Sequence, residues 1–141
     1  FVFVGSLHPR KNILRLLKAF HFFKTDTKSN FKLALAGAIF WGENEMYELL
    51  KTLNIQEEVI FTGRLANEDL RNIIASAFAL TYVPYFEGFG IPLVEAMQCG
   101  TPILAANTSC LPEIAGDAAI YANPFDENEI KQAMVTLYEE G

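Results

Sequence analysis

The chain has 141 residues, of which 51% are hydrophobic and 20% charged, and its net charge is −6. This length is typical of one domain, and the apolar content excludes a disordered chain. No apolar run approaches the roughly 20 residues of a membrane span, and the acidic balance argues against non-specific nucleic-acid binding.

Short apolar runs alternate with amphipathic stretches along the first half of the chain. Strands are predicted over residues 1–4, 33–36 and 59–61, each soon followed by a glycine. Helices are predicted over 13–20, 46–53 and 67–77, where apolar residues recur at helical spacing. We expect the side chains of Asn12 and Asn67 to cap the first and third of these helices.

The second half of the chain continues this alternation. Strands are predicted over residues 79–83, 102–105 and 119–121. A helix is expected to start near Pro92 and to end just before Gly100, because these residue types mark helix ends. Asp126 and Glu129 have the spacing of a capping box at the start of the last helix.

Strands that alternate with helices through short loops predict a parallel sheet covered on both faces. The fold class is therefore a doubly wound, Rossmann-like α/β domain of about six strands over residues 1–141. In such folds ligands bind beyond the carboxyl ends of the strands. The loops at that edge are predicted to be 5–11, 37–43, 63–66, 84–90 and 106–112.

Several common sites of this fold are missing from the sequence. The first loop, which starts at Gly5, has one glycine where a dinucleotide site needs three, and no Gly-Lys-Ser/Thr phosphate loop or Gly-x-Ser-x-Gly elbow is present. Neither the two histidines nor the two cysteines show metal-ligand spacing. We therefore expect no metal and no cofactor, and a reducing compartment such as the cytoplasm.

Basic residues are concentrated at the start of the chain. Residues 1–32 carry seven basic groups and one acidic group, whereas residues 33–141 carry four basic and sixteen acidic groups. This asymmetry indicates either one defined anionic partner or the solvated face of a helix, which we favour for Lys18, Lys24 and Lys28. Arg10 and Lys11 lie between a strand end and a helix start, where fixed cations suit a phosphate; solvated loop charges are an equal alternative.

A glycine-rich loop carries the second candidate site. Gly88 and Gly90 precede a helix start, so a ligand can approach the backbone and its free N–H groups closely. Glu87 lies in this loop, and Glu95 lies in the helix among apolar residues, where a carboxylate needs hydrogen-bond donors. Sugar hydroxyls are suitable donors; the alternative is that Glu95 lies on the exposed side of the helix.

These residues carry a family resemblance. Glu87-Gly-Phe-Gly-Ile-Pro-Leu-Val-Glu95-Ala-Met, followed by Cys-Gly100-Thr-Pro102, resembles the signature of group 1 glycosyltransferases, the retaining family 4 with a GT-B fold. The resemblance continues along the whole chain in Phe3-Val4-Gly5, Arg10-Lys11-Asn12, Leu35-Ala36-Gly37, Val59-Ile60-Phe61-Thr62-Gly63, Leu111-Pro112-Glu113, Gly116-Asp117-Ala118 and Pro124. It corresponds to the C-terminal, nucleotide-sugar-binding half of such enzymes, without the N-terminal acceptor-binding domain.

The resemblance implies a role for individual residues. Lys11 and Arg10 would hold the donor diphosphate, Glu87 would contact the donor sugar, and Glu95 would bind the ribose hydroxyls. Ser6 stands where many members carry an arginine, so the phosphate would depend more on Lys11 and Arg10. The resemblance also implies further substrate-binding positions. Those along the phosphate and sugar would be Gly5, Gly88, Phe89, Gly90, Ile91 and Leu93, and those beside the base would be Gly63, Arg64 and Leu65.

The resemblance further implies the donor-binding half of a retaining hexosyltransferase, with GDP-mannose or a UDP-sugar as donor. The acceptor would be a glycan or a lipid-linked glycan bound through the N-terminal domain, in bacterial surface-polysaccharide synthesis. The expected location is the cytoplasm, with peripheral contact at the inner membrane face in the full-length protein, and this chain alone should be inactive. The alternative is a non-catalytic nucleotide-binding module of the same fold.

Overall fold

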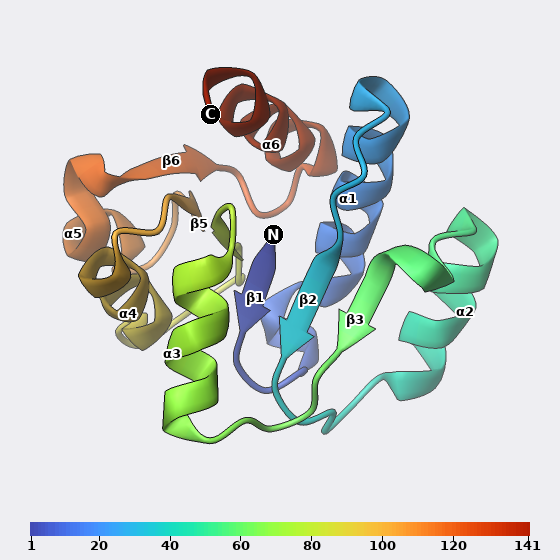
Figure 1. Cartoon of the computed structure of the whole chain (residues 1–141), viewed down its shortest axis with the longest axis horizontal. Helices are drawn as coiled ribbons and strands as arrows, with labels where there is room; N and C mark the ends of the chain where they lie inside the picture. The colour runs from blue at the N-terminus through green and yellow to red at the C-terminus, as the bar shows by residue number, and fades with distance from the viewer.

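Six parallel strands form a single sheet in the order β3-β2-β1-β4-β5-β6 in a computed structural model that describes all residues 1–141 (Figure 1). The strands are β1 Val2–Val4, β2 Leu33–Ala36, β3 Val59–Phe61, β4 Leu80–Tyr82, β5 Ile103–Ala106 and β6 Ala119–Ala122. Every predicted strand is present within one residue of its expected bounds. The order reverses between β1 and β4, which confirms the doubly wound fold and places its switch point there.

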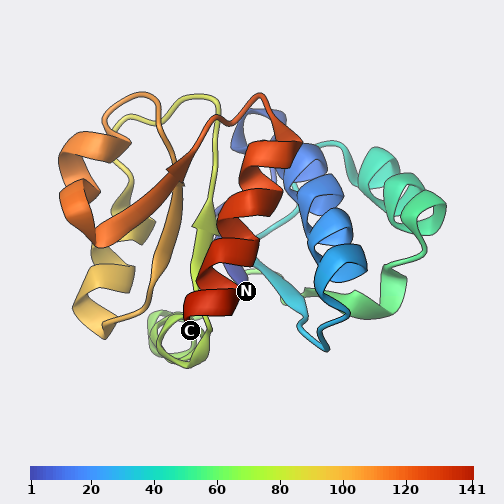
Figure 2. The ribbon, with the colours of Figure 1, turned by 90° about the horizontal axis from the view of Figure 1, so that it is seen from above.

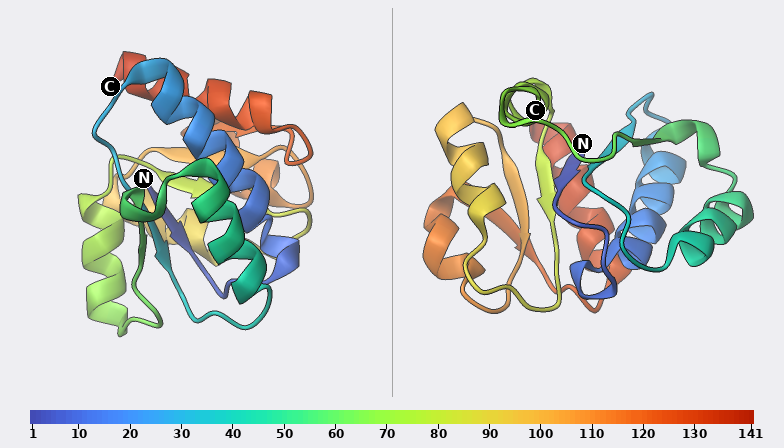
Figure 3. Two further views of the ribbon diagram at one scale, coloured as in Figure 1. Left: turned by 90° about the vertical axis from the view of Figure 1, so that its right-hand side faces the viewer. Right: turned by 90° about the horizontal axis from the view of Figure 1, so that it is seen from below.

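Helices follow the strands as predicted, with one short addition, α5. They are α1 Ile13–Thr27, α2 Glu43–Leu53, α3 Asn67–Ser76, α4 Ile91–Cys99, α5 Leu111–Ala115 and α6 Glu127–Glu140, with 3-10 turns at Pro9–Lys11, Gln56–Glu58 and Gly116–Ala118. Right-handed crossovers place α1 and α2 on one face of the sheet, and α4 and α5 on the other. The last helix, α6, returns to pack against α1, far away in sequence (Figures 2 and 3).

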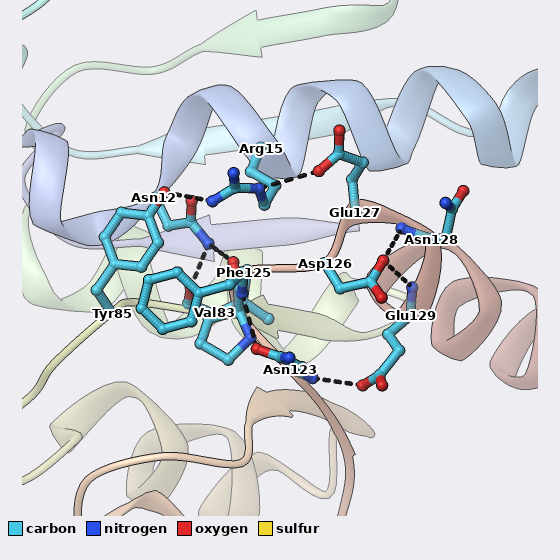
Figure 4. A network of polar contacts seen from close by, with 11 residues as sticks. Asn12, Arg15, Val83, Tyr85, Asn123, Phe125, Asp126, Glu127, Asn128 and Glu129 are labelled. Carbon is cyan, nitrogen blue, oxygen red and sulfur yellow. Dashed lines mark hydrogen bonds and ion pairs between the residues drawn. The ribbon is translucent and has the colours of Figure 1, made fainter.

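The side-chain caps predicted for the first and third helices do not form. Asn12 has a left-handed backbone, with φ of 65°, and its side chain makes no capping hydrogen bond. Its Nδ2 instead donates to the carbonyls of Val83, at 2.9 Å, and Pro124, at 2.6 Å (Figure 4). Asn67 is already inside α3, whose N-cap residue, Ala66, has no polar side chain. Asn12 thus occupies the N-cap position without capping through its side chain, whereas Asn67 lies one residue past the N-cap.

The start of α6 confirms half of the predicted capping box. The Asp126 Oδ1 accepts the backbone N–H groups of Asn128 and Glu129, at 2.9 and 3.3 Å (Figure 4). The Glu129 carboxylate does not bond back to Asp126; it accepts the N–H of Asn123 at 2.7 Å. Glu129 therefore fastens the turn that precedes the helix.

Ion pairs account for much of the basic start of the chain. Lys24 and Lys32 both contact Glu58, at 3.0 and 3.1 Å, and Arg15 contacts Glu127 at 3.0 Å. Lys24 is thus a paired, half-buried residue and does not belong to a solvated helix face. The basic residues of this segment that lack an ion pair are Arg10, Lys18 and Lys28.

Aromatic rings close the amino end of the sheet. Phe1, Phe31 and Phe78 lie just before β1, β2 and β4, and the Phe31 and Phe78 ring centroids are 4.9 Å apart. Phe23 of α1 and Tyr138 of α6 complete the cluster, with ring centroids 5.6 Å apart. Because this end is packed with rings, the carboxyl end of the sheet is the edge at which loops can form a ligand site.

At the carboxyl edge, the chain segments after β1 and β2 approach closely. The Gly5 N–H donates to the Ala36 carbonyl at 3.0 Å. A Cβ atom added at Gly37 would lie 1.8 Å from the Gly5 carbonyl oxygen, a distance no side chain can occupy. The glycine that ends the second predicted strand is therefore required for the pairing of the two loops.

We predict that Gly37→Ala lowers the free energy of unfolding by about 1–3 kcal/mol, because the new methyl group forces the Gly5 backbone away. Gly88→Ala is the matched control, since a Cβ there has no atom within 4 Å. Urea denaturation measures both variants. Equal midpoints for the two would contradict the close packing at Gly37.

Asn12→Ala should also lower the free energy of unfolding, by about 1–3 kcal/mol, because two buried carbonyls lose their hydrogen-bond donor. The left-handed backbone at this position adds to the cost, since alanine tolerates it less well than asparagine. Asn128→Ala serves as the control, because Asn128 is exposed and its side chain makes no hydrogen bond. Thermal unfolding of the two variants should separate them clearly.

Candidate functional site

A buried lysine lies at the switch point of the sheet. Lys11 ends the 3-10 turn after β1 and is only 7% exposed. Its Nζ donates to Glu87 Oε2 at 2.8 Å and to the Tyr82 hydroxyl at 3.2 Å. The loops after β1 and β4 are thus joined by an ion pair between the two residues that were predicted separately to contact phosphate and sugar.

The uncharged side chain of Tyr82 packs beside this ion pair. The ring stacks on Phe3, with centroids 5.8 Å apart, and the Lys11 Nζ lies 5.6 Å from its centroid. Burial raises the pKa of the Tyr82 phenol above its ordinary value, and the negative charge of Glu87 raises it further. The phenol therefore stays protonated, and it contacts the Lys11–Glu87 pair as a neutral group.

The glycine loop after Glu87 presents unused hydrogen-bond donors. The backbone N–H groups of Gly88, Phe89, Gly90 and Ile91 donate to no acceptor in the protein. Gly90 is the N-cap of α4, has φ of 88° and has no side chain to cap the helix. These donors and the positive end of the helix dipole form a place where an anion is stabilised.

The loop after β5 holds Glu87 in position. The Ser109 Oγ accepts the N–H of Glu87 at 3.2 Å, and the Cys110 thiol donates to its carbonyl at 3.4 Å. The Leu111 side chain packs against Gly90 so closely that a Cβ there would lie 2.6 Å away. Sequence reasoning named this loop as part of the ligand edge without identifying these supporting contacts.

These groups surround a cavity of about 480 Å³. Among the predicted site residues, those that line it are Gly5, Lys11, Glu87, Gly88, Phe89, Gly90, Ile91 and Glu95. The Glu95 carboxylate is half-buried and has no hydrogen bond or ion pair within the protein. Glu95 lies at the border of this cavity and of a neighbouring one between α3 and α4, and its role remains a prediction.

A second cavity of about 310 Å³ continues from the first, because Val4 and Gly5 line both. Arg64 and Leu65 of the loop after β3 form its far wall. Arg64 is exposed and has no ion pair, and it shares this cavity with Ser6. The groove thus runs along the carboxyl ends of the strands from Glu95 to Arg64.

Three predicted site residues lie outside this groove. Arg10 is exposed and lines neither cavity; its backbone carbonyl accepts the N–H of Tyr85 at 3.0 Å. Leu93 is fully buried, and its N–H is used by the Gly90 carbonyl at 3.0 Å. Gly63 lines neither cavity and, with φ of 69°, turns the chain toward Arg64. These residues were predicted together with their sequence neighbours, but adjacent residues of a loop or helix do not all face the same cavity.

Among the groove residues that were not predicted as site residues, two have aromatic side chains. Tyr82 was predicted only as part of a strand, and Phe40, which is 69% exposed in the second cavity, only as part of a loop. A polar ring at the last position of the strand at the switch point was the available signal for Tyr82. An aromatic residue in a predicted ligand-edge loop was the signal for Phe40.

The arrangement can hold an anion next to hydroxyl groups. Lys11, Arg64 and the open N–H groups provide positive charge and donors, and the free carboxylate of Glu95 can accept hydrogen bonds from hydroxyls. No three His, Cys, Asp or Glu side chains converge as ligands for a metal ion. None of the helices has the length and apolar character needed to cross a membrane.

Solved structures share this architecture. An Anabaena protein, Alr3699/HepE, crystallised with UDP and glucose, superposes with a TM-score of 0.88 at 23% identity, over 99% of this chain and 38% of that one. WaaG, a glycosyltransferase involved in lipopolysaccharide biosynthesis, superposes with a TM-score of 0.86 at 23% identity, over 98% of this chain and 37% of that one. These structures confirm the predicted fold class, a Rossmann-like domain of the GT-B type.

Sequence comparison identifies the family. O-antigen chain mannosyltransferase B of Escherichia coli is 34% identical over 129 residues, 92% of this chain and 34% of the relative. O-antigen chain mannosyltransferase RfbU of Salmonella typhimurium is 28% identical over 137 residues, 97% of this chain and 38% of the relative. The chain thus spans little more than a third of these proteins. The family model described as glycosyl transferases group 1 matches residues 1–141, and the chain belongs to this family.

Proposed function

We propose that residues 1–141 form the donor-binding half of a glycosyltransferase, which binds a nucleotide diphosphate sugar in the groove between Glu95 and Arg64. The observation that carries this proposal is the grouping of Lys11, Glu87 and four unused backbone N–H groups around one cavity. A diphosphate would replace Glu87 as the partner of Lys11 and would accept the open N–H groups of the glycine loop.

The two glutamates would take different parts of the donor. Glu87 lies beside Lys11, so a diphosphate on the cation would bring the transferred sugar to this carboxylate. Glu95 borders the cavity one helical turn into α4, and its unpaired carboxylate suits the two adjacent hydroxyls of a ribose. The base would then lie in the second cavity, between Phe40 and Leu65.

The reaction we propose is transfer with retention from GDP-mannose or a UDP-sugar to a glycan or lipid-linked acceptor. The relatives from Escherichia coli and Salmonella typhimurium are O-antigen mannosyltransferases, which supports mannose as the sugar. The leaving diphosphate would be stabilised by Lys11 and the N–H groups of the loop, and this electrostatic term would be the main catalytic contribution. A second domain, facing this groove in the cytoplasm, would bind the acceptor.

A non-catalytic nucleotide-binding module would use the same groove. The two functions differ in the need for a sugar at Glu87 and for a facing domain. The two functions are distinguished by an assay of the transfer of radiolabelled mannose from GDP-mannose to a glycan acceptor. The chain is assayed once alone and once fused to the N-terminal domain of a relative. Transfer only by the joined protein supports the enzyme, and transfer by neither supports the module.

Lys11→Ala should weaken the binding of GDP or UDP by about 1–3 kcal/mol, because a charge-assisted contact to phosphate is lost. Binding of the phosphate-free nucleoside should not change. Lys18→Ala is the control, since Lys18 is exposed on α1 and unpaired. Isothermal titration calorimetry measures all of these affinities, and an equal loss for nucleoside and nucleotide would refute the phosphate role of Lys11.

Glu95→Gln should weaken the nucleoside diphosphate and the nucleotide sugar alike, because both contain the ribose. Glu87→Gln should weaken only the nucleotide sugar, and should leave the sugar-free nucleotide bound at least as tightly as before. The second expectation follows from the ion pair, since the neutral side chain no longer competes with phosphate for Lys11. Identical ligand profiles for the two variants, measured by calorimetry, would contradict this division.

A further inference from the structure

A separate cavity of about 310 Å³ opens at the same edge of the sheet. It is formed by the loop after β1, the start of α1, the loop between β2 and α2, and Tyr85 of the loop after β4. It shares no lining residue with either cavity of the donor groove. Its size is within the range of small-molecule sites in proteins.

Two aromatic side chains line this cavity. Trp41 is 67% exposed, an unusual position for so large an apolar ring. Tyr85 is held more firmly, because its ring stacks on Phe125 with centroids 4.8 Å apart and its hydroxyl accepts a hydrogen bond of 2.6 Å from Arg15 (Figure 4). The cavity thus has two aromatic walls, the exposed ring of Trp41 and the ring of Tyr85, which its contacts hold in place.

Two polar groups in the lining have hydrogen-bonding capacity that a ligand can use. The Nδ1 of His8 accepts the N–H of Arg10 at 3.3 Å, so the neutral imidazole carries its proton on Nε2 and can donate to a ligand. The Glu45 carboxylate, in the first turn of α2, has no hydrogen bond or ion pair within the protein. Asn12 also borders the cavity, but its Nδ2 is committed to two backbone carbonyls and its Oδ1 is buried, so it contributes to the wall and offers no contact to a ligand.

This set of groups suits a neutral ligand with many hydroxyls. No lysine or arginine lines the cavity, and the Glu45 carboxylate would repel an anion, so the site does not suit a phosphate or a nucleotide. A pyranose ring has apolar C–H faces that pack on aromatic rings, as well as hydroxyls that both donate and accept hydrogen bonds. The Glu45 carboxylate can accept from those hydroxyls, and the His8 imidazole can donate to them.

We infer that this cavity binds a pyranose residue of the glycan acceptor, so that this domain contributes an acceptor site beside its donor groove. The inference rests on the proposed function for the nature of the glycan. The position of the cavity supports this inference. Asn12 and Tyr85 line it, and they lie one and two residues in sequence from Lys11 and Glu87, which line the donor groove. The loop over residues 8–12 therefore separates the bound glycan from the donor phosphates.

Trp41 is the only tryptophan of the chain, so its fluorescence reports on this cavity directly. Titration of the full 141-residue chain with α-linked mannotriose should give a saturable change in Trp41 emission. A saturating concentration of GDP should not reverse the change. Calorimetry should show that Trp41→Ala and Glu45→Gln each weaken mannotriose binding by about tenfold, the effect of losing one good contact.

Glu48→Gln is the matched control, because Glu48 lies on the same helix with its carboxylate 3.7 Å from Lys51 and outside the cavity. This variant should bind mannotriose as the unaltered chain does. No saturable binding at about 10 mM mannotriose, equal loss in the Glu48 control, or displacement by GDP would each overturn the inference. Failure of the donor proposal is distinguishable, since it would abolish GDP binding and leave the Trp41 response intact.

Discussion

One buried amide joins three separate parts of the carboxyl edge. The Nδ2 of Asn12 donates to the carbonyl that follows β4, at Val83, and to the carbonyl of Pro124 between β6 and α6. The position of Lys11, one residue earlier, depends on this anchor, and so does the route by which the chain enters α1. Because both hydrogen bonds are buried, removal of the amide leaves the two backbone carbonyls without their donor.

The electrostatics of the groove follow from this anchoring. Lys11 is buried, and a buried ammonium is stable only with partners, which Glu87 and Tyr82 provide. The pair brings the loops after β1 and β4 together at the switch point, where the fold leaves a crevice between diverging helices. The backbone N–H groups after Glu87 are left without acceptors, so the groove offers unused donors beside the ion pair.

The fold followed from the sequence because strand and helix periodicities agreed with the turn residues at nearly every boundary. The site was predicted less completely, because a one-dimensional pattern does not say which side chains meet. Lys11 and Glu87 were both identified, yet their ion pair joins residues 76 positions apart. Asn12 occupies the predicted N-cap position, but the partners of its side chain, Val83 and Pro124, are distant in sequence and could not be predicted from it.

The pairing of Lys11 with Glu87 has a consequence for turnover. Under the proposed roles, an arriving donor separates the two residues: its diphosphate takes the ammonium and its sugar hydroxyls take the carboxylate. After transfer, the nucleoside diphosphate still holds Lys11, but no sugar remains to hold Glu87. The carboxylate then competes again for its original partner, 2.8 Å away in the ligand-free chain. Under the proposed roles, an internal counterion of this kind would favour product release.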